Sequence, residues 1–162
     1  MKTTTILAAI ARNKNGEVLL VEQEAKYDSK ANWMLPGGKL EESENIFGSL
    51  KRELLEETGL NLISVDGFAY TIQILDIEKS SMFNVNVFEV SLESGEIKPQ
   101  DPDEEILQAV YLPVKEAISK LRNNKFSYTY EPSSDCIENF SNNYKFWEYH
   151  WQDGDTRLVS RY

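Results

Sequence analysis

Three glutamates occur close together in the chain, at a spacing that could hold a metal ion. Glu53, Glu56 and Glu57 stand at i, i+3 and i+4 in residues 45–58, a segment whose apolar residues recur with the period of an α-helix. On a helix this spacing projects the three carboxylates from one face. Like charges so placed lower the stability of a helix by about 0.2–0.5 kcal/mol per pair. A hard divalent cation would remove this repulsion, because the carboxylate oxygens would coordinate it.

The residues around these glutamates suit the same chemistry. The carboxylates are expected opposite an apolar stripe formed by Ile46, Leu50 and Leu54. Gly59 is placed to end the helix, and Arg52 can hold one carboxylate through its planar fork of donors. Gly37 and Gly38 let the preceding loop adopt backbone angles that other residues resist, so a carbonyl oxygen can approach the same ion. The competing interpretation is a solvated acidic helix face, the usual meaning of a bare run of glutamates.

A longer pattern surrounds the glutamates, between Trp33 and Leu60. Its defining residues are Gly38, Glu44, Arg52, Glu53, Leu54, Glu56, Glu57, Gly59 and Leu60. At average residue frequencies, nine such positions would coincide by chance with odds on the order of one in ten million. The pattern resembles the complete Nudix box of the Nudix hydrolase superfamily, in its MutT-type form.

This resemblance implies a fold and a reaction. The fold would be an α+β protein, an α/β/α sandwich with a mixed β-sheet between helices. The reaction would be metal-dependent cleavage of a diphosphate linkage in a nucleoside diphosphate joined to another moiety, with release of a nucleoside monophosphate. Mg²⁺, or Mn²⁺ in its place, would bind Glu53, Glu56, Glu57 and the carbonyl of Gly38, and Arg52 would complete the catalytic set. The structural supports of the box would be Gly37, Glu44 and Gly59.

The general base and the substrate stay open at this point. Family members use either a box glutamate or one from a distant loop, for which Glu104 and Glu105 are candidates here, with a solvated turn as their competing role. Substrate candidates are modified nucleoside triphosphates, ADP-ribose, nucleotide sugars, dinucleoside polyphosphates and capped RNA. A catalytically inactive nucleotide-sensing module is the alternative to an enzyme. An isopentenyl diphosphate isomerase would need a catalytic cysteine in its own motif, which the isolated Cys136 does not provide.

The composition favours one domain over residues 1–162 with a small substrate. The chain has 162 residues, 41% of them hydrophobic, and a formal net charge of −10. This charge disfavours nucleic acid and anionic membranes as partners, and it weighs against capped RNA. Cations held by acidic side chains can still attract a nucleotide-type diphosphate. A single cysteine excludes an internal disulfide, and the lack of a long apolar segment leads us to expect a cytoplasmic protein.

The order of predicted elements is mixed. Strands are expected at 3–12 and 17–22, paired as a hairpin, and after the helix at 62–75, 82–92 and 106–112. A second helix should begin near Pro113 and reach about Arg122, whereas residues 123–144 give no clear pattern. This order fits a sheet sandwiched between helices better than a doubly wound parallel sheet.

A C-terminal β-hairpin is predicted around Asp153-Gly154, a favoured two-residue turn. This register would set Tyr149 opposite Leu158 and Trp147 opposite Ser160, with Trp147, Tyr149 and Trp151 on one face. We expect these aromatic residues to fill the core, because aromatic stripes usually pack inward. A base-stacking platform or a homodimer contact is the alternative.

Overall fold

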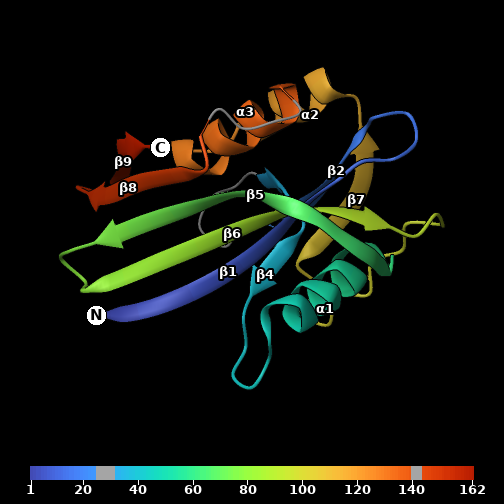
Figure 1. The fold of residues 1–162 in the computed structure, drawn as a ribbon, viewed down its shortest axis with the longest axis horizontal. Helices are drawn as coiled ribbons and strands as arrows, with labels where there is room; N and C mark the ends of the chain where they lie inside the picture. Colours follow the sequence, from blue (N-terminus) through green and yellow to red (C-terminus); the bar gives the residue numbers. More distant parts are fainter. Residues whose placement is uncertain (25–31, 140–143) are drawn as a thin grey trace.

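The computed structural model describes residues 1–24, 32–139 and 144–162, and Figure 1 gives their arrangement. The helical elements are α1 (Ile46–Thr58), α2 (Val114–Leu121), the 3₁₀ turn η1 (Ser127–Thr129) and α3 (Glu131–Asn139). The strands are β1 (Lys2–Ala11), β2 (Val18–Gln23), β3 (Asn32–Met34), β4 (Gly37–Lys39), β5 (Leu62–Asp76), β6 (Ser81–Leu92), β7 (Ile106–Leu112), β8 (Phe146–Gln152) and β9 (Asp155–Arg161).

These strands form two sheets in the described part of the chain. The larger has the order β4-β1-β6-β5-β8-β9, and the smaller has the order β3-β2-β7. The larger sheet is mixed, because β1 runs parallel to β6 and β5 runs parallel to β8, whereas its other pairs are antiparallel. Helix α1 lies on one side of it, and α2 and α3 lie on the other (Figure 1). The predicted sandwich is therefore confirmed. None of the helices in the described ranges is long and apolar enough to cross a membrane.

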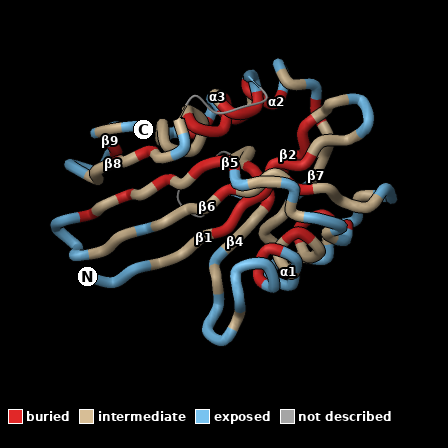
Figure 2. Tube along the Cα trace, in the orientation of Figure 1, coloured by how far each residue is buried: buried red, intermediate tan, exposed pale blue. Residues whose placement is uncertain are grey.

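The core consists of two clusters, and Figure 2 shows how their buried residues are distributed along the chain. On the α1 side, alternate residues of β1 pack with the helix, and this cluster contains Leu7, Ala9, Ala11, Leu19, Leu50, Leu54 and Val90. On the other side, α2 and α3 cover a larger cluster that includes Tyr70, Ile72, Leu121, Ile137, Trp147 and Tyr149. Because side chains alternate across a strand, each strand contributes to both layers.

Helix α1 has defined caps at both ends. The Asn45 side chain accepts a hydrogen bond of 2.8 Å from the Gly48 N–H at the start. At the end, Gly59 adopts a left-handed φ of 76°, and its N–H donates to the Leu55 carbonyl at 2.8 Å. A Cβ at Gly59 would overlap the Lys98 carbonyl oxygen, so this position combines a positive φ with a close approach. The predicted helix and its glycine terminator are confirmed.

The connection from β6 to β7 is bound to the end of α1. The N–H of Lys98 donates to the Thr58 carbonyl at 2.9 Å, and the N–H of Gln100 donates to the Glu56 carbonyl at 2.7 Å. These bonds satisfy two carbonyls that a helix terminus leaves without partners inside the helix. They also fix the position of the backbone that leads into Asp101 relative to the glutamates of α1.

The predicted hairpin between the first two strands is wrong. Strands β1 and β2 belong to different sheets, and the backbone pairing described at their junction is an isolated bridge between Arg12 and Val18, next to a turn closed by Asn13 and Glu17. Strand β1 instead pairs along its length with β6. Sequence patterns report strand character, whereas the choice of partner depends on the whole sheet.

The C-terminal hairpin is confirmed, with one change of register. Asp153 and Gly154 have φ values of 53° and 78°, as a tight turn of this kind requires. Tyr149 lies opposite Leu158 as predicted, but a shift after Glu148 sets Trp147 opposite Arg161 instead of Ser160.

The aromatic residues of this hairpin divide into core and boundary positions. Trp147 and Tyr149 are buried, which confirms their predicted place in the core. Trp151 is only half-buried, and its ring centroid lies 5.1 Å from that of Phe126. The segment 123–144, which gave no clear pattern, contains η1 and α3 in its described part. The Tyr70 hydroxyl and the Ser133 hydroxyl, 2.8 Å apart, join α3 to the sheet.

Candidate functional site

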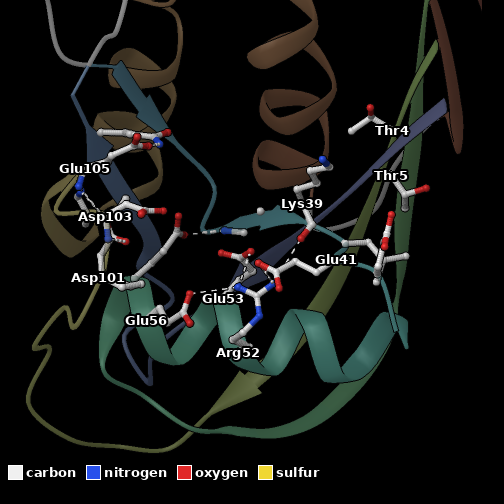
Figure 3. Close-up of a pocket in the computed structure, with 18 of the residues that line it drawn as sticks. Thr4, Thr5, Lys39, Glu41, Arg52, Glu53, Glu56, Asp101, Asp103 and Glu105 are labelled. Carbon is white, nitrogen blue, oxygen red and sulfur yellow. Dashed lines mark hydrogen bonds and ion pairs between the residues drawn. The ribbon is translucent and has the colours of Figure 1, made fainter. Parts of the chain in front are cut away.

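A cavity of about 1040 Å³ opens beside α1 (Figure 3). Its walls are α1, β4 with the loop that follows it, the N-terminal half of β1, Gln23 at the end of β2, and residues 101–103 and 105–106. The acidic side chains that line it are Glu41, Glu42, Glu53, Glu56, Glu57, Asp101, Asp103 and Glu105. The sequence predicted the box side of this cavity but did not identify the β1 wall, Lys2 to Thr5, whose residues belong to no recognisable motif.

Glu57 is the most buried carboxylate of the site, with 7% of its surface exposed. It stands at i+7 from Leu50 and i+3 from Leu54, so it continues the buried stripe of α1. The prediction that Glu57 lies opposite this stripe is therefore wrong. Burial raises the pKa of Glu57 to about 8, although its Oε2 accepts a 2.7 Å hydrogen bond from the Gly37 N–H, which favours the charged form. The carboxylate of Glu53 adds repulsion.

Glu53 and Glu56 are linked through Arg52. One guanidinium nitrogen, Nη1, donates to Glu53 Oε1 at 2.9 Å and to Glu56 Oε2 at 3.1 Å. Burial raises the pKa of Glu53 despite the adjacent positive charge. The structure thus gathers the predicted carboxylates on one wall of the cavity, with a protein cation between two of them.

Glu44 is a further carboxylate partner of Arg52. The guanidinium donates to both of its carboxylate oxygens, with Nε to Oε1 at 2.7 Å and Nη2 to Oε2 at 3.0 Å. These hydrogen bonds lower the pKa of Glu44 to about 2 and raise that of Arg52. Glu44 also accepts a hydrogen bond from the Glu41 N–H at 3.3 Å, so it connects the loop to the helix. This arrangement supports the predicted organising role, and Arg52 forms hydrogen bonds with three carboxylates where one was expected.

Gly37 and Gly38 bring β4 against both β1 and α1. Gly38 pairs with Leu7 of β1, and a Cβ at Gly38 would overlap the Glu53 carboxylate. At Gly37, with φ of 150°, a Cβ would overlap the Leu7 carbonyl oxygen. The two glycines therefore permit the close approach of the loop backbone to the carboxylates that the sequence suggested.

The two candidates for a distant base differ in position. Glu105 lines the cavity, and its Oε2 accepts a hydrogen bond of 3.0 Å from Gln23 Nε2. Glu104 is exposed, has a φ of 53° and is not among the described residues that line the cavity. Gln23 and Asp101 also line the cavity, and sequence reasoning missed both. The turn residues Asp101-Pro102 gave a signal for Asp101, because aspartate commonly bonds to backbone N–H groups two or more residues ahead.

The donor set of this wall fits the chemistry of a hard divalent cation. Glu53, Glu56 and Glu57 supply carboxylate oxygens, the ligands that Mg²⁺ and Mn²⁺ prefer. Each commits one oxygen to a hydrogen bond with Arg52 or Gly37, which leaves the other for a ligand. Among the described residues, no three acidic side chains converge on one point, so coordination requires rotation of these side chains. A buried carboxylate facing two others is the observation that favours a cation here.

A family model matches most of the chain. A model described as NUDIX domain matches residues 1–132. Among curated relatives, Nudix hydrolase 5 of Arabidopsis thaliana is 32% identical over 122 residues, which are 74% of this chain and 39% of that protein. The 8-oxo-dGTP diphosphatase of Buchnera aphidicola is 43% identical over 63 residues, 39% of this chain and 48% of that protein. The chain thus spans less than half of the length of these relatives.

Solved structures share the fold. A structure described as a MutT protein from Bacillus halodurans superposes with a TM-score of 0.72 at 18% identity, covering 98% of this chain and 96% of that one. A structure of a NUDIX hydrolase from Nitrosomonas europaea gives a TM-score of 0.70 at 20% identity, covering 87% of this chain and 93% of that one. At these identities the likeness establishes the architecture, including the mixed sheet between helices.

Proposed function

Because the chain belongs to the Nudix domain family, we propose that it hydrolyses a diphosphate linkage in a small nucleotide-type substrate and releases a nucleoside monophosphate. The observation that carries this proposal is the buried carboxylate of Glu57, which lies beside Glu53 and Glu56 at the wall of a 1040 Å³ cavity. Burying a carboxylate without a neighbouring positive charge is costly, and a bound cation would supply that charge. A merely solvated acidic face would not bury Glu57.

Members of this family generally use divalent metal ions. In this chain Glu53, Glu56, Glu57 and the carbonyl of Gly38 would hold Mg²⁺ or Mn²⁺. When bound, such an ion supplies a Lewis acid that offsets the charge developing on the phosphate oxygens. Arg52 would keep Glu53 and Glu56 next to each other through its two Nη1 hydrogen bonds, and the two hydrogen bonds from Arg52 to Glu44 would hold Arg52 in place.

The chemical step consumes one water molecule. Water attacks one phosphorus of the bridge, the bond from that phosphorus to the bridging oxygen breaks, and two phosphate-bearing products result, one of them a nucleoside monophosphate. A base must accept the proton of the water. We propose Glu105 for this role over Glu104, because its side chain lines the cavity and Gln23 holds one of its oxygens. A base among the box glutamates is the competing assignment.

The substrate class is supported by the names of relatives. A mouse protein named 8-oxo-dGDP phosphatase is 32% identical to this chain over 110 residues. With the Buchnera diphosphatase, it makes oxidised guanine nucleotides the first substrates to test. ADP-ribose, nucleotide sugars and dinucleoside polyphosphates complete the panel, because the box forms only the half of the site that cleaves the diphosphate.

The proposal is tested by incubating the protein with this panel and resolving the products by mass. With Mg²⁺ we expect a nucleoside monophosphate from at least one substrate, and no product in excess chelator. Product masses also identify the bond that is cut. Binding without turnover across the panel would favour the nucleotide-sensing module instead.

A further inference from the structure

Residues 101–106 fold around one carboxylate, that of Asp101. Its Oδ1 accepts a hydrogen bond from the Asp103 N–H at 3.1 Å. Its Oδ2 accepts two more, from the N–H of Glu105 at 2.8 Å and from the N–H of Ile106 at 3.1 Å. The Asp101 carbonyl also accepts from the Glu104 N–H at 3.2 Å. One side chain therefore fixes the backbone of the loop.

Both ends of this loop are attached to the walls of the cavity. On one side, the Gln100 N–H donates to the Glu56 carbonyl of α1 at 2.7 Å. On the other side, the Glu105 carbonyl accepts from the Glu24 N–H at 2.8 Å, directly after β2. The position of the Glu105 backbone is therefore set relative to α1 and to β2.

The side chain of Glu105 depends on the same arrangement. Glu104 holds a left-handed φ of 53°, a conformation that non-glycine residues disfavour. The hydrogen bonds of Asp101 span this residue, from the N–H of Asp103 to that of Ile106, and oppose its relaxation. Figure 3 shows Asp101, Asp103 and Glu105 along one wall of the cavity, above Glu56.

From these contacts we infer that Asp101 is a positioning residue, whose carboxylate folds the loop so that Glu105 is presented to the cavity. The inference rests on the proposed function, in which Glu105 accepts the proton of the attacking water. A different route is open to Asp101, because its negative charge also acts on Glu57. Capping of the loop and action through charge predict different results for asparagine and alanine at this position.

The test compares Asp101→Asn and Asp101→Ala with Glu96→Ala as the control, because Glu96 is an exposed carboxylate on the same β6–β7 connection and is not among the described residues that line the cavity. Alanine removes all three side-chain hydrogen bonds, whereas the asparagine oxygen can keep the two from Glu105 and Ile106. Both remove the charge. If Asp101 acts by capping, Asp101→Ala should lower kcat at least tenfold and Asp101→Asn only a fewfold, with KM within threefold of the parent. Glu96→Ala should keep kcat within twofold of the parent.

The double variant decides whether Asp101 acts through Glu105. In the Glu105→Gln background, Asp101→Ala should change kcat less than twofold, because the group it positions is already inactive. An equal loss in both backgrounds, or equal losses for asparagine and alanine, would overturn the inference. A Glu105→Gln variant with the kcat of the parent would also overturn the inference. In that case the proposed function would still stand, provided that the parent hydrolyses its substrate in the presence of Mg²⁺.

Hydrogen exchange tests the capping without any turnover. In Asp101→Ala, the amides of residues 103–106 should exchange at least tenfold faster than in the parent, while those of α1 remain protected. Unchanged exchange in this loop would refute the inference, even if no substrate were found.

Discussion

Replacing Glu57 with glutamine should stabilise the metal-free protein and nearly abolish its activity. Glutamine keeps the size of the side chain and can still accept the hydrogen bond from the Gly37 N–H, but it needs no proton to be neutral. The parent side chain has a pKa raised by burial from an ordinary value of 4.5 to about 8. Folding of the metal-free parent at neutral pH therefore requires proton uptake, and folding of the variant does not.

The sign and the size of the effect follow from this shift. Between pH 4.5 and about 8 the folded parent holds a proton that the unfolded chain has released, so the stability of the parent falls as the pH rises. Relative to the variant, this loss amounts to about 1 kcal/mol at pH 5 and about 3 kcal/mol at pH 7. For a chain of this length the second figure corresponds to roughly 6–12 °C in Tm.

Thermal melting in excess chelator at pH 5 and pH 7 measures this difference. Glu57→Gln should melt above the parent at both values, with the larger gap at pH 7. The matched control is Glu56→Gln, whose carboxylate is partly exposed and bonded to Arg52, and which should not melt above the parent. A gap that stays constant with pH, or a variant that melts below the parent, would refute the burial argument.

Activity should change in the opposite direction. With one anionic ligand removed, cation binding and stabilisation of the transition state should both weaken, and a loss of roughly 4 kcal/mol corresponds to about a thousandfold lower rate. Turnover of parent and variant is measured with saturating Mg²⁺. If the variant keeps more than about a tenth of parental turnover, a loss under roughly 1.4 kcal/mol, Glu57 is not an essential ligand.

Other consequences concern the metal, the core and the cysteine. Dialysis against a chelator should abolish hydrolysis and added Mg²⁺ should restore it, because oxygen ligands bind Mg²⁺ reversibly; full turnover after dialysis would contradict this. Trp147→Ala should lower the free energy of unfolding by roughly 3–5 kcal/mol in urea titrations, whereas Leu158→Ala, at a position 40% exposed, should cost under about 1 kcal/mol. Cys136 is buried, and burial raises the pKa of its thiol to about 11, so a thiol reagent at pH 8 should label it only after unfolding; rapid labelling of the native protein would show that this part of the core opens.

The parts of the fold that sequence predicted best are those fixed by local rules. Helix α1 begins at its asparagine cap and ends at Gly59, and the C-terminal turn forms at Asp153-Gly154. The partner of β1 was not predictable in this way, because pairing with β6 is decided by residues about eighty positions apart. The bulge after Glu148 likewise has no local signal, so Trp147 was assigned the wrong partner.

In the site, too, local features were predictable from the sequence and contacts between distant segments were not. The spacing of the three glutamates predicted that they would gather, but the burial of Glu57 depends on how α1 packs, which the spacing alone does not report. The roles of Asp101 and Gln23 depend on bonds between segments distant in the chain, and neither residue belongs to the box.

A single-turnover reaction in ¹⁸O-labelled water tests the central claim most directly. With Mg²⁺ and a substrate cleaved in the panel, hydrolysis of a diphosphate bridge predicts one labelled oxygen per turnover, in only one of the two products, with a nucleoside monophosphate as one of them. Because water attacks a single phosphorus, the labelled product identifies that atom. Release of inorganic phosphate alone, or products without label, would contradict the account.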